Sequence, residues 1–209
     1  MRKAVVLSSG GLDSTVCLAL AVKEFGNENV FALNIFYGQR HKKEIEASKK
    51  IAEYYHVKRI ELDLSACFKD CKSSLMESSN EEISTGTYHE QLSNGRLHTV
   101  VPFRNGLFLS AAVSLILGQS PDDELVIYLG NHAGDIENHE YADCSTEFTD
   151  AMTKAIYFGT DGKVTFVSPF EGKKKSEIVK YGLSINVPFN LTWSCYNGKE
   201  KPCGCCTTC

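Results

Sequence analysis

The sequence lacks a long hydrophobic run and a surplus of basic residues. Its longest apolar stretch, residues 106–118, contains two serines and is far shorter than the roughly 20 residues of a membrane-spanning helix. The apolar start at residues 4–7 is interrupted by residues 8–13 before it reaches signal-peptide length, so we expect a cytoplasmic protein without a membrane partner. The net charge of −4 and the pI near 5.9 favour a small-molecule substrate over direct nucleic-acid binding.

Cysteine, by contrast, is abundant. The chain has nine cysteines in 209 residues, and five of them fall in the last fifteen positions. Disulfides are rare in cytoplasmic proteins, so such clustering indicates metal binding or chemistry rather than covalent cross-linking.

Strand-like and helix-like hydrophobic patterns alternate along the chain. Strand patterns cover residues 3–7, 30–35, 58–62, 124–129 and 164–167, and helical spacing covers residues 13–24, 42–55, 105–117 and 145–157. This alternation predicts an α/β fold with a doubly wound parallel sheet that helices cover on both faces. On the helix at residues 42–55, we expect a solvated face formed by Glu44, Glu46, Lys49 and Lys50.

Two segments depart from this alternation. Residues 65–98 are rich in Ser, Asn, Glu and Thr, contain Gly86 and Gly95, and are too long for an ordinary connection, which predicts a long loop or lid. Residues 193–209 form a small cysteine-rich appendix. We therefore expect an α/β domain over residues 1–192 followed by this appendix.

A glycine-rich hexapeptide, S-G-G-L-D-S at residues 9–14, lies directly between the first expected strand and the first expected helix. Backbone amides and the helix dipole bind anions at such a position. The Walker lysine and the G-x-G-x-x-G pattern are absent, so neither P-loop phosphoryl transfer nor NAD binding is indicated. The alternative is a plain glycine turn with a helix N-cap at Asp13 or Ser14. The expected phosphate-binding residues are Ser8, Ser9, Gly10, Gly11, Leu12, Asp13, Ser14 and Thr15.

The pattern S-G-G-x-D-S resembles the pyrophosphatase loop of the PP-loop family, which has the adenine nucleotide alpha-hydrolase-like fold. Members of that family split ATP between the α- and β-phosphates and transfer AMP to a substrate oxygen. The resemblance implies that the loop holds pyrophosphate. It also implies that Asp13 helps to hold Mg²⁺, a hard cation that prefers oxygen ligands.

Four cysteines near the end of the chain have the spacing C-x7-C-x2-C-x2-C. Four thiolates in a reducing compartment indicate a tetrahedral, structural Zn²⁺ site, while an iron–sulfur cluster is the competing interpretation. Cys205 adjoins one of these cysteines and is expected to point away. The expected ligands are Cys195, Cys203, Cys206 and Cys209.

Further short motifs follow along nearly the whole chain. They are F-Y-G-Q-R-H at residues 36–41, V-P-F-R-N at 101–105, Y-A-D-C at 141–144, C-Y at 195–196 and C-G-C-C-T-T-C at 203–209. Together with the hexapeptide, their order and spacing resemble the 7-cyano-7-deazaguanine synthase family of queuosine biosynthesis. The resemblance implies an ATP-dependent carbon–nitrogen ligase that converts 7-carboxy-7-deazaguanine and ammonia to the nitrile through an acyl-adenylate and an amide. It also implies bound Zn²⁺, Mg²⁺ with ATP, and a homodimer.

The implied chemistry suggests roles for particular residues. Pyrophosphate and an oxyanion both need positive partners, which are the roles that we assign to Arg40 and Arg104. Lys175 lies in a K-x-E pattern similar to a late helix start in the family, and we expect it to contact phosphate beside Asp13 and Ser14. A solvated helix turn is the alternative for this lysine.

Substrate is expected at the sheet edge that also carries the ATP loop, because polar residues follow the strand that ends near residue 129. The expected substrate-binding residues are His132, Asp135, Tyr141, Asp143 and Cys144. Ala142 stands where the family usually has proline, which predicts a less rigid loop.

Three other functions remain open from the sequence. An amine on a protein or metabolite could accept the acyl group in place of ammonia. Sulfur insertion into tRNA uses a similar ATP loop, but it needs a basic surface and a reactive thiol, which the acidic pI and the cysteine spacing disfavour. A non-catalytic nucleotide-binding module with the same fold is the third alternative.

Overall fold

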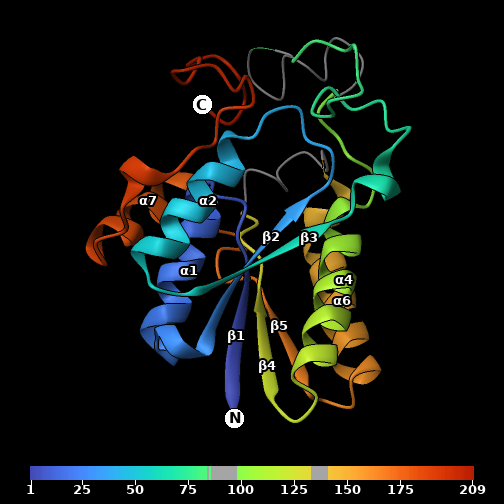
Figure 1. The fold of residues 1–209 in the computed structure, drawn as a ribbon, viewed down its shortest axis with the longest axis vertical. Coiled ribbons are helices and arrows are strands. Elements are labelled where there is room, and N and C mark those ends of the chain that lie inside the picture. Colours follow the sequence, from blue (N-terminus) through green and yellow to red (C-terminus); the bar gives the residue numbers. More distant parts are fainter. Residues whose placement is uncertain (84, 86–97, 133–140) are drawn as a thin grey trace.

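A parallel β-sheet forms the centre of the protein, which is seen here in a computed structural model that describes residues 1–83, 85, 98–132 and 141–209. Its described strands have the order β3-β2-β1-β4-β5, and every pair of neighbours is parallel (Figure 1). The strands are β1 (Arg2–Leu7), β2 (Val30–Phe36), β3 (Lys58–Asp63), β4 (Glu124–Tyr128) and β5 (Val164–Val167).

Helices cover both faces of the sheet. One face carries α1 (Leu12–Phe25), α2 (Lys43–Tyr54) and α7 (Lys175–Ser184), and the other carries α4 (Arg104–Gln119) and α6 (Thr146–Gly159) (Figure 1). Short 3₁₀ turns lie at η1 (Asn27–Asn29), η2 (Ser65–Phe68), η3 (Ala142–Cys144) and η4 (Phe189–Leu191).

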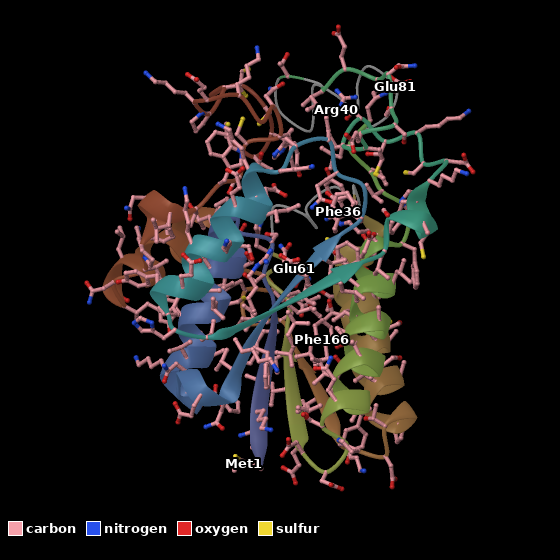
Figure 2. The ribbon with its side chains drawn as sticks, in the orientation of Figure 1. Met1, Phe36, Arg40, Glu61, Glu81 and Phe166 are labelled. Atoms are coloured by element: carbon pink, nitrogen blue, oxygen red, sulfur yellow. The ribbon has the colours of Figure 1, made fainter. Side chains whose placement is uncertain are left out.

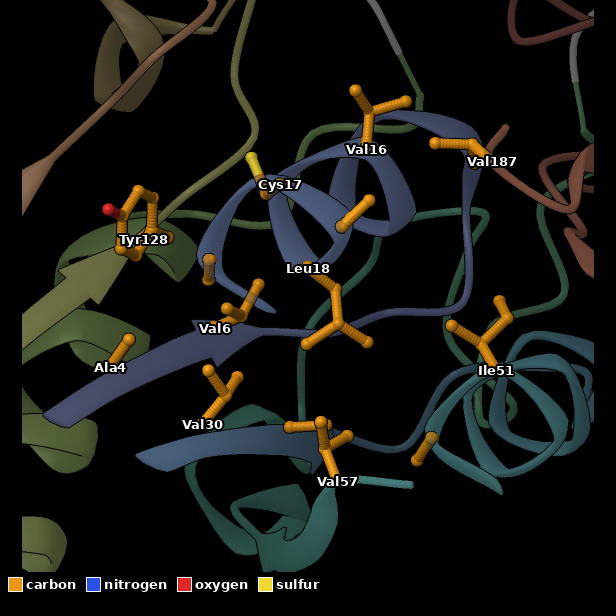
Figure 3. Close-up of a cluster of buried hydrophobic side chains, with 14 of the residues drawn as sticks. Ala4, Val6, Val16, Cys17, Leu18, Val30, Ile51, Val57, Tyr128 and Val187 are labelled. Carbon is orange, nitrogen blue, oxygen red and sulfur yellow. The ribbon is translucent and has the colours of Figure 1, made fainter. Parts of the chain in front are cut away.

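The core lies between the sheet and these two helical layers. Ala4, Val5, Val6 and Leu7 of β1 are all buried, as expected for a central strand covered on both faces. Alternate residues of this strand face the two layers, so that Val6 packs with α1 (Figure 3) and Val5 packs toward α4. Burial on both faces therefore fixes β1 and the turn that follows it.

The strand order reverses between β1 and β4. After β1 the chain enters α1 on one face, whereas β4 is preceded by α4 on the other face. The connections diverge here and leave a crevice at the carboxyl ends of the two strands, which is where open α/β sheets bind ligands.

The α/β prediction is confirmed, and the expected strands and helices end within two residues of the observed ones. One local expectation was wrong: Glu44 does not belong to a solvated face, because it lines a cavity at the carboxyl edge of the sheet. In the segment expected as a loop or lid, η2 is followed by turns, and Met76 forms an antiparallel bridge with Gln39. No helix in the described ranges has the length and hydropathy of a membrane-crossing segment.

Candidate active site and cysteine cluster

A cavity of about 210 Å³ opens at the carboxyl edge of the sheet, at the reversal between β1 and β4. The sequence-predicted residues that line it are Ser8, Ser9, Gly11, Asp13, Ser14, Arg104, His132, Tyr141, Cys144 and Lys175. Segments far apart in the chain therefore converge on the turn after β1.

The turn after β1 presents its polar atoms to the cavity. Helix α1 begins at Leu12 with Gly11 as its N-cap, so neither Asp13 nor Ser14 caps the helix. The Ser9 hydroxyl lies 3.1 Å from the Ser14 hydroxyl and accepts a hydrogen bond from the Gly11 amide at 3.2 Å. Serine hydroxyls at the positive end of α1 form a suitable site for phosphate oxygens.

Three of the expected phosphate residues hold the turn from behind and do not line the cavity. The Thr15 hydroxyl donates to the Gly11 carbonyl at 2.7 Å, and Leu12 packs against the hydrophobic core. Gly10 has φ +91°, and its backbone lies against α2. These contacts fix the shape of the turn.

Replacing Gly10 tests how closely the turn fits α2. A Cβ at this position would stand 2.2 Å from the Glu44 carbonyl oxygen, in a backbone conformation that L side chains rarely adopt. We expect Gly10→Ala to lower the free energy of unfolding by on the order of 3 kcal/mol, measured by urea denaturation. The control is Gly118→Ala, because a Cβ there meets nothing within 4 Å and alanine favours the helix. Equal stability of the two variants would contradict the close packing.

Asp13 is the acidic centre of the turn. Its Oδ2 atom lies 3.0 Å from Lys175 Nζ and 3.9 Å from His132 Nε2, and Lys175 Nζ lies 3.5 Å from that histidine nitrogen. Its Oδ1 atom is buried and has no hydrogen-bond partner among the described residues. An unpartnered carboxylate oxygen beside a phosphate site has the chemistry that Mg²⁺ requires, so these residues fit a bound magnesium ion.

Arg104, the first residue of α4, forms the opposite wall. Its guanidinium carbon lies 5.7 Å from the centre of the Tyr37 ring. Burial disfavours the charge, but acidic groups around it prevail and raise the pKa of Arg104 above its ordinary value; they are Tyr37, Tyr196, Cys144 and Asp143. Arg104 is therefore a fixed positive charge in the cavity wall.

Glu44 lies in the first turn of α2 and also faces the cavity. Burial raises the pKa of this carboxyl group to about 7, although the charge of Arg104 acts in the opposite direction. No sequence pattern predicted this burial, because it comes from segments that are remote in the chain. Other lining residues to which we had assigned no role are Asn34, Tyr37, Ser194, Tyr196 and Thr208. Asn34 carried a signal as a polar residue within an otherwise apolar strand, and Tyr37, Tyr196 and Thr208 lie in the short motifs noted above.

Two predicted site residues lie elsewhere. Arg40 is absent from the cavity wall, and its guanidinium donates to the carbonyl oxygens of Ser79 and Glu81 at 2.6 and 2.9 Å (Figure 2). Asp143 accepts a hydrogen bond from the Asn105 amide at 2.8 Å and so anchors the start of α4. Asp135 lies outside the described residues.

The other predicted substrate residues are at the wall. Tyr141 lines the cavity, and its hydroxyl lies 2.7 Å from the Thr99 hydroxyl. Cys144 is buried at the end of η3, and its sulfur accepts a hydrogen bond from the side-chain Nδ2 of Asn105 at 3.2 Å. The segment with Ala142 therefore contributes side chains to the cavity from both of its ends.

The four predicted cysteines come together in the appendix. The sulfur atoms of Cys195, Cys203, Cys206 and Cys209 all lie within 4.8 Å of one another, and Cys205 is not part of the group. Hydrogen bonds from the Cys205 backbone, the Asn197 side chain and the Cys206 backbone lower the pKa of the Cys203 thiol to about 5. A thiolate among four converging sulfurs fits a metal ion.

The appendix is joined to the glycine turn. The Trp193 amide donates to the Gly10 carbonyl at 2.9 Å, and the Leu12 amide donates to the Ser194 hydroxyl at 3.2 Å. On the cysteine side, the Thr208 hydroxyl donates to the Ser194 carbonyl at 2.6 Å. The cysteine cluster thus lies beside residues that hydrogen-bond to the glycine turn.

The parallel sheet with a glycine turn after its first strand gives the protein an α/β fold of the adenine nucleotide alpha-hydrolase-like type. A sequence profile of the family described as queuosine biosynthesis protein QueC matches residues 3–209. The chain belongs to this family.

Individual relatives agree with the profile. The 7-cyano-7-deazaguanine synthase of Oceanobacillus iheyensis is 39% identical over 210 residues, a match that covers 100% of this chain and 90% of that protein. The synthase of the same name from Picrophilus torridus is 39% identical over 215 residues, covering 100% of this chain and 84% of that protein.

Solved structures share the fold at low sequence identity. NMN synthetase from Francisella tularensis has a TM-score of 0.54 and 14% identity, covering 95% of this chain and 68% of that chain. The U34-tRNA thiolase NcsA from Methanococcus maripaludis, solved with its 4Fe-4S cluster, has a TM-score of 0.51 and 19% identity. The match covers 93% of this chain and 59% of that chain. At these identities the likeness concerns the fold alone.

Proposed function

We propose that the protein uses ATP to convert 7-carboxy-7-deazaguanine and ammonia to 7-cyano-7-deazaguanine. The observation that carries the proposal is a single cavity that unites the glycine turn, the Asp13–Lys175 pair and Arg104, in a chain whose full length aligns with synthases of that name.

The reaction needs activation because a carboxylate does not react with ammonia until one of its oxygens becomes a good leaving group. Attack of the carboxylate on the α-phosphorus of ATP gives an acyl-adenylate and releases pyrophosphate. Ammonia then displaces AMP and gives the amide. A second ATP adenylates the amide oxygen and releases pyrophosphate, and loss of AMP with the protons on nitrogen then gives the nitrile in the same cavity.

The residues of the turn would hold the departing pyrophosphate. Ser9 and Ser14 offer hydroxyl groups at the N-terminus of α1, and Lys175 offers a positive charge 3.0 Å from Asp13. Asp13 would bind Mg²⁺ through its unpartnered oxygen, and that ion would supply charge neutralisation at the phosphates.

Arg104 is placed to stabilise negative charge on the substrate oxygen as ammonia attacks. A catalytic role for Arg40 finds no support in its position, since its guanidinium is bonded to the 79–81 segment. His132, Tyr141 and Cys144 would contact the deazaguanine from the wall that follows β4. Asp135 stays a prediction.

The cysteine cluster would bind a structural zinc ion. Four sulfurs at about 2.3 Å from one Zn²⁺ in a tetrahedron stand about 3.8 Å apart, and Cys209 lies 3.8 Å from Cys203 and 3.5 Å from Cys206 by sulfur distance. A four-iron cluster carries one cysteine on each iron, which would spread the sulfurs further. With four thiolates no position remains for water, so zinc would hold the appendix in place.

Product analysis tests the proposal. The purified protein is incubated with ATP, Mg²⁺, ammonium and 7-carboxy-7-deazaguanine, and nucleotides and bases are separated by chromatography with mass detection. We expect AMP, pyrophosphate and the nitrile. AMP with the amide alone would favour transfer to another amine acceptor, and no nucleotide turnover would overturn the enzyme assignment and favour a binding module.

The remaining expectations from the sequence belong to the same proposal. We expect a homodimer in the cytoplasm that acts on small molecules and does not bind nucleic acid directly. Sedimentation velocity tests the first expectation, and a tRNA gel-shift assay at physiological salt tests the last.

A further inference from the structure

The amide-forming step needs ammonia with a free lone pair. At neutral pH the dissolved species is almost entirely ammonium, which has no lone pair and cannot attack an acyl carbon. A group in the cavity that accepts a proton makes the abundant ammonium usable for carbon–nitrogen bond formation, and a carboxylate or an imidazole of suitable pKa is the usual choice.

Among the described residues, two carboxylates line the cavity, those of Asp13 and Glu44. Asp13 is 3.0 Å from Lys175 and belongs to the phosphate end. The imidazole of His132 lies 3.5 Å from the ammonium group of Lys175, so the positive charge of this lysine already faces the histidine. Glu44 is different, because its carboxylate has no hydrogen-bond or ion-pair partner within the described part of the chain.

The surroundings of Glu44 also suit a proton acceptor. It projects from the first turn of α2, whose backbone packs on Gly10, so the residue is held beside the ATP turn, and its side chain lines the cavity. Burial raises its pKa to about 7, which lets one group both accept and release a proton near neutral pH. The charge of Arg104 acts on it, and Glu44 in turn contributes to raising the pKa of Tyr37. The other ionisable groups of the wall are Asp13, His132, Tyr141, Cys144, Lys175 and Tyr196.

We propose that Glu44 binds ammonium at this wall and accepts its proton, delivering ammonia to the acyl-adenylate. The inference rests on the proposed function. One N–H bond of ammonium breaks and the proton goes to the Glu44 carboxylate; the nitrogen lone pair then forms a bond to the acyl carbon. The bond from that carbon to the phosphate oxygen breaks, AMP leaves with the electron pair, and the amide nitrogen loses its extra proton to solvent.

The test separates ammonia attack from adenylation. Hydroxylamine is largely neutral at pH 7 and needs no proton acceptor, so it traps the acyl-adenylate directly as a hydroxamate. In Glu44→Gln we expect kcat/KM for ammonium at pH 7 to fall about 100-fold, while hydroxamate and pyrophosphate formation change less than about threefold. The matched control is Glu46→Gln, an exposed carboxylate on the same helix, which should leave both reactions unchanged.

The pH profile adds a readout that a structural role would not move. As pH rises toward the pKa of ammonium, free ammonia becomes available, so the deficit of Glu44→Gln should shrink. A deficit that is constant with pH, or an equal loss with hydroxylamine, would overturn the proton-acceptor role. Absence of AMP and hydroxamate from the wild-type protein would instead refute the proposed function.

Thermal unfolding checks that the carboxyl group ionises as required. The pKa of Glu44 in the folded protein, about 7, exceeds the ordinary value of 4.5, so its contribution to stability is lost as pH rises between these values. The melting temperature of the wild type should therefore fall relative to Glu44→Gln between about pH 5 and pH 8. Parallel curves would contradict a buried, titrating carboxylate at this position.

Discussion

Asp13→Asn should lower the rate of AMP formation by about a thousandfold. The substitution keeps the size of the side chain and removes the charge that Lys175 contacts at 3.0 Å. It also removes the negative oxygen that we assign to Mg²⁺, so the concentration of Mg²⁺ needed for half-maximal activity should rise. Initial rates of AMP release, measured over a series of Mg²⁺ concentrations, give both quantities.

The control for this variant is Asp122→Asn, an exposed aspartate before β4 at the opposite edge of the sheet. It should retain wild-type rates and the wild-type Mg²⁺ dependence. An Asp13→Asn protein that folds and still releases AMP at the wild-type rate would show that the turn after β1 does not handle ATP.

Cys206→Ser should remove the metal and weaken ATP binding at least tenfold. Loss of one thiolate leaves three ligands and a buried hydroxyl, and structural zinc sites contribute directly to folding free energy. The effect reaches ATP because Ser194, whose hydroxyl accepts from the Leu12 amide, is held by Thr208 beside the cluster. Metal content by mass spectrometry and ATP affinity by calorimetry measure the two results.

The adjacent cysteine provides the control. Cys205 is exposed and is not among the four converging sulfurs, so Cys205→Ser should keep one zinc per chain and wild-type ATP affinity. If Cys206→Ser lost zinc but bound ATP normally, the link between the appendix and the turn would be unimportant for the nucleotide. If both variants kept zinc, the ligand assignment would be wrong.

Features that are formed by residues close together in the sequence could be predicted. The turn at residues 9–14 and the clustered cysteines are local patterns, so their backbone spacing alone brings the chemical groups together. The alternation of strands and helices likewise follows from short-range periodicity, which is why the boundaries lie close to the observed ones.

Roles that depend on distant contacts could not be predicted. Glu44 looks like a solvated helix residue because nothing nearby in sequence reveals that its helix packs on Gly10. Arg40 follows a strand that ends at the cavity, yet its guanidinium turns to backbone carbonyls at residues 79–81. Asp143 sits in a motif that resembles a substrate loop, but its carboxylate anchors α4.

The link between Leu12 and Ser194 spans 182 positions of sequence. Four of the described strands precede residue 129, so most of the sheet can assemble while the chain is still being synthesised. Leu12 and Ser194 can meet only after the segment that contains Ser194 has been synthesised. Their contact must also outweigh the chain entropy that is lost when so long a loop closes. A stalled nascent chain would therefore carry a nearly complete sheet, while the glycine turn after β1 would still lack its contact with Ser194.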